Sequence, residues 1–190
     1  MKKRIYNQTS LFGPAYAYLI VLSPPSEIRN SIVCIKQDLD ALGDIGGKNR
    51  HSIPHITLRD KLTDDESLPY TIKELLKRNG NKPFLIKVNG WGYFDHQHSV
   101  TIYLKIENPE PIVDLMAALR SSSRTPHISL AKRISYTTFD TMRPYLDKLE
   151  YSAEWLCSEI VVLRKLMSKK ELGFKDKYPI PLQDNNENNL

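Results

Sequence analysis

The chain has 190 residues, 41% of them hydrophobic and 26% charged, which suits a soluble globular protein with one sizeable core. Its longest apolar run, residues 15–22, is too short to span a bilayer, and no small-residue cleavage site follows it, so we expect neither a membrane helix nor a signal peptide. The formal net charge of +5 favours anionic partners such as phosphates or RNA without requiring them.

The predicted elements begin with an apolar strand over residues 15–22 and a helix over 23–42, whose start is marked by two prolines and a serine. The next strand covers residues 53–58. A helix over 63–80 follows, with acidic residues in its first turn and a glycine at its end. A strand over 82–95 then runs into a bend punctuated by glycines.

The second half of the chain repeats this order of elements. A strand, a helix, a strand, a mostly helical segment and a strand are predicted at residues 98–108, 109–123, 126–134, 135–153 and 159–167. Residues 173–182 contain prolines that favour an edge strand. Because no glycine-rich loop follows any strand, the pattern predicts an α+β fold rather than a doubly wound one. We expect two pseudo-symmetric lobes with mainly antiparallel sheets flanked by helices, and an active-site cleft between them.

The two lobes are predicted to form one domain over residues 1–182, followed by a disordered polar tail over 183–190. Residues 1–10 are polar as well, and we expect them to be frayed or to form an arm. Cys34 and Cys157 lie in apolar surroundings without a CxxC spacing. They are therefore predicted to be buried free thiols of a cytoplasmic protein. We expect a monomer.

Two short motifs lie at equivalent places in the repeated order. Residues 54–58 are Pro-His-Ile-Thr-Leu and residues 126–130 are Pro-His-Ile-Ser-Leu. Side chains two apart in a strand share a face, so His55 and Thr57 point one way, as do His127 and Ser129, while the aliphatic residues point into the core. If the lobes are related by a pseudo-twofold axis, two imidazoles and two hydroxyls meet in one cleft.

Two imidazoles near neutral pH can hold opposite protonation states, so one can accept a proton while the other donates one. In-line displacement at phosphorus needs such a pair, and the hydroxyls of Thr57 and Ser129 can hold the non-bridging oxygens. This chemistry requires no metal. His96 and His98 with Asp95 form the other candidate cluster, but no further ligand completes a metal site there, so no metal and no cofactor are predicted.

The residues His55-Ile56-Thr57-Leu58 and His127-Ile128-Ser129-Leu130 resemble the paired motifs of the 2H phosphoesterase superfamily, which includes 2′-5′ RNA ligase-like proteins and 2′,3′-cyclic nucleotide phosphodiesterases. The element order over residues 16–167 fits the two-lobed fold of that superfamily. The resemblance implies metal-independent cleavage or formation of a phosphodiester on a ribose. It also implies that His127 activates water and His55 protonates the leaving oxygen, or the reverse.

Further contacts are expected around these motifs. Many relatives carry an arginine where this chain has Lys132. Strand alternation instead predicts that Arg133 lies on the same face as His127, and Arg59 on the same face as His55. All three are candidate phosphate-binding residues.

Three aromatic residues are candidates for stacking on a base: Tyr103, its counterpart Tyr18 in the first half, and Phe94. Packing at the junction of the lobes is the alternative for these rings.

Two functions remain open on the sequence alone. The first is a phosphoesterase that acts on 2′,3′-cyclic phosphate ends of RNA or nucleotides, or on related 2′-5′ linkages. The second is a non-catalytic RNA or nucleotide binding module with the same cleft.

Overall fold

The computed structural model describes residues 14–167 and 173–183. Within these residues, eight strands lie at Tyr16–Leu22 (β1), Ile56–Thr63 (β2), Phe84–Asp95 (β3), Val100–Ile106 (β4), His127–Ile134 (β5), Ser152–Cys157 (β6), Glu159–Leu166 (β7) and Asp176–Pro181 (β8). The same two segments contain five helices, at Ser26–Leu42 (α1), Gly47–Arg50 (α2), Leu68–Asn79 (α3), Glu110–Ala118 (α4) and Tyr136–Leu146 (α5). Within the described part of the chain, no helix is long and apolar enough to cross a membrane.

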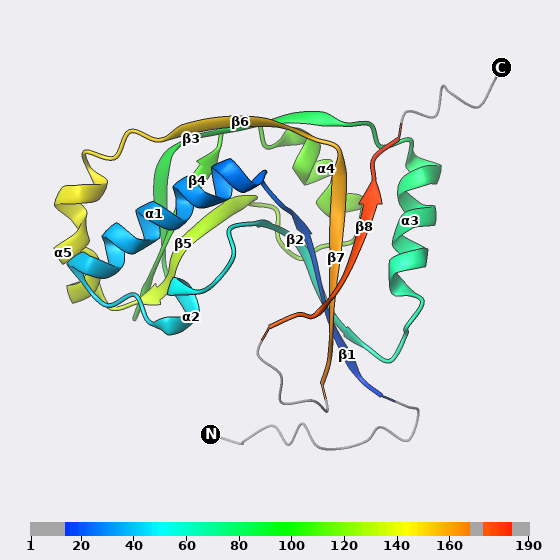
Figure 1. Cartoon of the computed structure of the whole chain (residues 1–190), viewed down its shortest axis with the longest axis horizontal. Helices are drawn as coiled ribbons and strands as arrows, with labels where there is room; N and C mark the ends of the chain where they lie inside the picture. Colours follow the sequence, from blue (N-terminus) through cyan, green and yellow to red (C-terminus); the bar gives the residue numbers. More distant parts are fainter. Residues whose placement is uncertain (1–13, 168–172, 184–190) are drawn as a thin grey trace.

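All eight strands form one curled antiparallel sheet, in the order β6-β3-β4-β5-β2-β1-β7-β8 (Figure 1). The sheet divides into two four-stranded halves at its centre, where β2 and β5 share a single registered pair, Ile56 with Ile128. In both halves the motif strand is innermost and the strand that precedes it in the chain is its outer neighbour. The α+β fold with antiparallel strands is confirmed, and the two expected lobes are halves of one sheet.

Two of the helices, α1 and α4, cross from one half of the sheet to the other. α1 follows β1 in the chain but contacts β5, while α4 follows β4 but contacts β2 (Figure 1). Each half therefore provides a helix that packs against the motif strand of the other half. This exchange holds the two motif strands side by side although they share only one registered pair.

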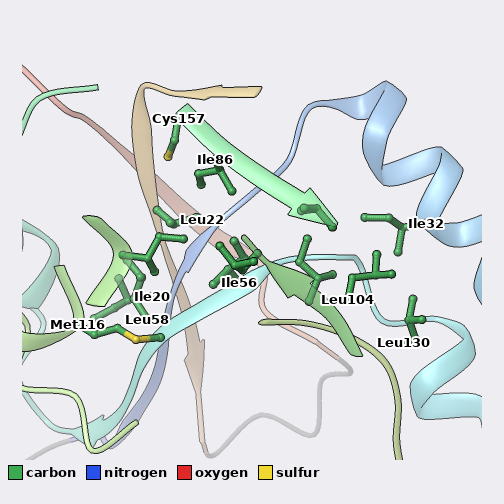
Figure 2. Packing of buried hydrophobic residues seen from close by; sticks show 14 of the residues in the cluster. Ile20, Leu22, Ile32, Ile56, Leu58, Ile86, Leu104, Met116, Leu130 and Cys157 are labelled. Carbon is green, nitrogen blue, oxygen red and sulfur yellow. The ribbon is translucent and has the colours of Figure 1, made fainter. Parts of the chain in front are cut away.

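The core lies between the helices and one face of the sheet, called here the core face. Strand β4 illustrates its origin, because Val100, Ile102, Leu104 and Ile106 are buried and alternate with Thr101, Tyr103 and Lys105 on the opposite face. Figure 2 shows the packing around Ile56, Leu58 and Leu104, to which α4 adds Met116. Aliphatic residues of both motif strands belong to this cluster, so the core fixes the orientation of the strands.

The sequence prediction was wrong in four places. It ended the first motif strand at residue 58 and began the next helix at residue 63 with acidic residues in its first turn, whereas β2 runs to Thr63 and α3 begins at Leu68 with no acidic residue in its first turn. It extended the last helix to residue 153, whereas α5 ends at Leu146 and residues 152–157 form the edge strand β6. It missed the short helix α2. It also predicted burial of both cysteines: both are free, but only Cys157 is buried and Cys34 is exposed. The expected frayed segment 1–10 and residues 184–190 of the expected tail lie outside the described residues.

Candidate active site

The two motif strands bring both histidines to the same face of the sheet, called here the site face. Around the pair Ile56–Ile128, antiparallel register places His55 level with Ser129 and Thr57 level with His127. All four side chains are partly exposed, while the isoleucines between them are fully buried. Each imidazole thus lies beside the hydroxyl residue of the other motif.

Both imidazoles are held in the same way. His55 Nδ1 donates to the carbonyl of Ile53 at 2.6 Å, and His127 Nδ1 donates to the carbonyl of Thr125 at 2.9 Å. A carbonyl oxygen can only accept, so each Nδ1 carries the proton and the Nε2 of the neutral ring has a lone pair available. Two rings with fixed tautomers and accessible Nε2 atoms can accept or donate protons at a group bound on the site face.

Burial lowers the pKa of both imidazoles below the ordinary value of histidine, and neighbouring cations add to this effect. For His55 the cations are Lys132 and Lys36, together with the His127 ring whenever that ring is protonated, whereas for His127 the cation is Lys132. The carbonyl hydrogen bonds act in the opposite direction on both groups. In the absence of an anion these effects favour the neutral form of both rings, and a bound phosphate would favour protonation of one of them.

A β-bulge follows the first motif and overturns the prediction for Arg59. Thr57 pairs with Val21 of β1, but Arg59 pairs with Ile20, so Leu58 is an extra residue in β2. The bulge returns Arg59 to the core face, on the opposite side of the sheet from His55. There its guanidinium donates to the carbonyl of Leu119 at the end of α4.

The second motif has a bulge at the equivalent position, and it affects Lys132. Ser129 pairs with Tyr103 but Ala131 pairs with Ile102, so the alternation shifts by one residue and Lys132 reaches the site face. Its charge lowers the pKa of both histidines. Lys132 and Arg133 both line a cavity of about 470 Å³, and His55 and Ser129 line the same cavity.

Two of the three predicted stacking residues lie beside His127. Phe94 and Tyr103 stack on each other with ring centroids 4.3 Å apart, and their centroids are 5.1 and 5.3 Å from that of His127. Gly92 makes room for this arrangement, because a Cβ there would lie 2.9 Å from the Tyr103 ring. Tyr18, by contrast, is only 1% exposed on the core face and donates to the carbonyl of Asp65, so its prediction as a stacking residue is wrong.

The remaining polar cluster near the site has structural partners of its own. Nε2 of His96 lies 3.0 Å from the hydroxyl of Thr101, and the carboxylate of Asp95 accepts a hydrogen bond from Tyr136 at 2.5 Å. No group of three or more potential metal ligands occurs among residues 14–167 and 173–183.

Comparison with known proteins identifies the family. The sequence model of the 2′-5′ RNA ligase superfamily matches residues 24–167, which include both histidine motifs. The chain belongs to the 2′-5′ RNA ligase superfamily. This confirms the resemblance to 2H phosphoesterases that the two motifs suggested. Among curated proteins, no sequence matches the chain significantly.

Solved structures similar to this member of the 2′-5′ RNA ligase superfamily share its fold. TT0787 of Thermus thermophilus is 19% identical, with a TM-score of 0.57 and a match covering 86% of this chain and 97% of that one. E. coli LigT in its apo form is 13% identical, with a TM-score of 0.57 and coverage of 89% and 95%. At these identities the likeness shows the fold alone.

In this superfamily member, two residues that the sequence interpretation missed hold the segments around the site in place. Lys36 of α1 is 1% exposed, and its Nζ donates to the carbonyl and the hydroxyl of Ser52 at 2.6 and 2.8 Å. Asn49 of α2 binds the backbone of Lys132. A signal for Lys36 was present, because it falls among Ile32 and Leu39 at the spacing of a buried helix face.

Replacing Lys36 with methionine should raise the pKa of His55. The cation is buried, and its charge disfavours protonation of the imidazole, so its removal makes the imidazolium less costly. Burial and Lys132 lower the pKa of Lys36 itself to about 8, so it is largely charged where His55 titrates. NMR titration of the imidazole C–H signals measures the shift. Lys87→Met, which removes an exposed charge from β3, is the control, and equal shifts in the two variants would contradict the prediction.

Proposed function

We propose that the protein is a metal-independent phosphoesterase that opens 2′,3′-cyclic phosphates at the ends of RNA or nucleotides, or cleaves related 2′-5′ linkages. The observation that carries this proposal is the matched pair of imidazoles, each with Nδ1 tied to the carbonyl two residues before it. Membership of the 2′-5′ RNA ligase superfamily supports the same class of chemistry.

In the proposed reaction, the phosphate lies on the site face with its non-bridging oxygens bound by the hydroxyls of Thr57 and Ser129 and by Lys132. One neutral imidazole takes a proton from water through Nε2 as the water oxygen bonds to phosphorus. The bond from phosphorus to the ribose 3′ oxygen breaks. The second ring, which is protonated when the phosphate is bound, gives its Nε2 proton to that oxygen. The products are a 2′-phosphate and a free 3′ hydroxyl.

The charges around the two rings favour one assignment of their roles. The charges of Lys36 and Lys132 both act on His55, whereas the charge of Lys132 acts on His127, which lies beside the aromatic pair. The ring with more cations around it holds its proton less well, so His55 suits the base and His127 suits the acid. This is the reverse of the first assignment that the family resemblance implied.

The base of the nucleotide is proposed to stack near Tyr103, beside an open hollow lined by Gly92, Trp91 and Lys105. Solved complexes of E. coli LigT contain 3′-AMP, ATP or NADP+, which supports a nucleotide ligand for this fold. We propose that one two-lobed domain carries the whole site, so a monomer suffices. Two free cysteines support a cytoplasmic location.

Incubation with a 2′,3′-cyclic mononucleotide and with a cyclic-phosphate-ended oligoribonucleotide, each in EDTA, tests the proposal. We expect release of a 2′-phosphate and a bell-shaped pH dependence of kcat/KM, with the maximum below pH about 6.5 because both pKa values are lowered. A strict requirement for a divalent metal or a flat pH profile would contradict this mechanism. Tight binding with no turnover of any substrate would favour the non-catalytic module instead.

A further inference from the structure

A cavity of about 470 Å³ opens between α2 and β5, next to His55 and Ser129. It extends away from the two histidines toward the loop and first turn of α2. Three of its lining residues are cations, Lys48, Lys132 and Arg133, and none of the lining residues is acidic. Lys132 lowers the pKa of both histidines, so it lies near the reacting phosphate. Lys48 and Arg133 are not among the charges that act on the histidines, so they line the part of the cavity farther from that phosphate.

The wall of this cavity is held together by specific hydrogen bonds. The Asn49 side chain accepts from the backbone N–H of Lys132 at 2.9 Å and donates to its carbonyl at 3.0 Å, which fixes α2 against β5. Arg133 has the left-handed conformation with φ 56°, and its N–H donates to the hydroxyl of Thr101 at 3.3 Å. The surrounding structure therefore holds the backbone of Arg133 in a conformation that non-glycine residues rarely adopt.

A buried charge lies behind the same wall. Lys36 donates to Ser52, which lines the cavity, and within the described residues Lys36 has no carboxylate partner. The nearby acids Asp40 and Asp44 bind Arg50 instead. Among the described residues, three cations therefore line the cavity and a fourth, Lys36, lies next to it, with no acidic residue in the lining. A low-dielectric wall strengthens their combined field inside the cavity.

We propose that this cavity binds a second phosphate of the substrate, with Lys48 and Arg133 as its direct ligands and Lys36 as a buried contributor to the field. The inference rests on the proposed function, because the first phosphate is assumed to lie between the two histidines. The substrate would then be a nucleotide that carries another phosphate besides the reacting one. That second group could be a terminal 5′-phosphate or the next internucleotide phosphate of an RNA end.

Calorimetric titration of the wild-type protein with product-like ligands tests this inference without turnover. We expect adenosine 2′,5′-bisphosphate, or an ApA dinucleotide ending in a 2′-phosphate, to bind about tenfold more tightly than adenosine 2′-monophosphate, as one added charge-assisted contact would give. Preference for the bisphosphate indicates a terminal phosphate, and preference for the dinucleotide indicates RNA. Equal affinity for all three ligands would overturn the proposal.

The variant Lys48→Met with Arg133→Met should reduce that preference to less than about twofold, because it removes both direct ligands. Both side chains are exposed, so the variant should fold, and unchanged thermal unfolding verifies this. Lys87→Met is the matched control and should keep the full preference. A preference that survives in the double variant would overturn the assignment. A preference seen in a protein that turns over no cyclic phosphate would uphold this site and refute the proposed reaction.

Discussion

Substitution of either His55 or His127 by alanine should lower kcat/KM for a 2′,3′-cyclic phosphate by about 10² to 10⁴-fold, the usual contribution of one general acid or base. Each substitution removes a proton-transfer atom that the carbonyl of Ile53 or Thr125 holds in place. The double variant should be only slightly worse than either single variant, because an acid and a base that act in one step do not contribute additively. Steady-state kinetics measures all three losses.

The choice of leaving group separates the two roles. An ester with a weakly basic leaving group, such as 4-nitrophenol, needs little help from an acid, so the variant that lacks only the acid should recover much of its activity on a nucleoside 4-nitrophenyl phosphodiester. The charge distribution predicts recovery for His127→Ala and none for His55→Ala. Recovery in His55→Ala alone would assign the roles in the opposite way. Recovery in neither variant, or equal recovery in both, would contradict acid–base catalysis by this pair.

The two histidines could be predicted from the sequence because a strand with period two is a local property, and each motif places its aliphatic residues and its polar residues on opposite faces. The duplicated element order added the inference that the two strands meet. The structure supplies the register, which puts each imidazole level with the hydroxyl residue of the other motif. Register between distant strands depends on packing of the whole sheet, which a single sequence does not display.

The residues beyond each motif could not be predicted in the same way. Simple alternation fails after Leu58 and after Leu130, where a bulge adds one residue to each motif strand. As a result, Arg59 contacts the end of α4 while Lys132 reaches the site face. The bulges occur at the same place in both motifs, so they belong to the duplicated architecture rather than to one loop.

The predictions for Tyr18 and for the β6 segment were wrong for different reasons. The counterpart of Tyr103 was chosen by analogy between the halves, but Tyr18 is on the core face with its hydroxyl bound to Asp65. Strand β6 was missed because it follows α5 after a short connection, and because its exposed positions, Ser152, Glu154 and Leu156, mix polar and apolar residues at the edge of the sheet. Local patterns do not distinguish such a strand from the end of a helix.

The junction between the halves of the sheet should be the most sensitive point of the core. Ile56 and Ile128 form the single registered pair of β2 and β5, and both are fully buried. Replacing Ile128 with alanine should reduce the free energy of unfolding by about 2 to 5 kcal/mol, because it leaves a cavity where the strands have no other registered pair. Urea denaturation measures this loss, and Ile128→Val, with an expected cost of about 0.5 to 1.5 kcal/mol, keeps the test informative if the alanine variant does not fold.

The same substitution should also affect the site, because Ile128 lies between His127 and Ser129 and its pairing keeps them level with the first motif. We expect Ile128→Ala to lower kcat/KM at temperatures where the protein is still folded. Ile180→Ala is the matched control, since Ile180 is buried in the edge strand β8, far along the sheet from the motifs. It should reduce stability but leave kcat/KM nearly unchanged. Equal losses of activity in the two variants would mean that global stability, rather than the pairing of the motif strands, determines how the two imidazoles are placed.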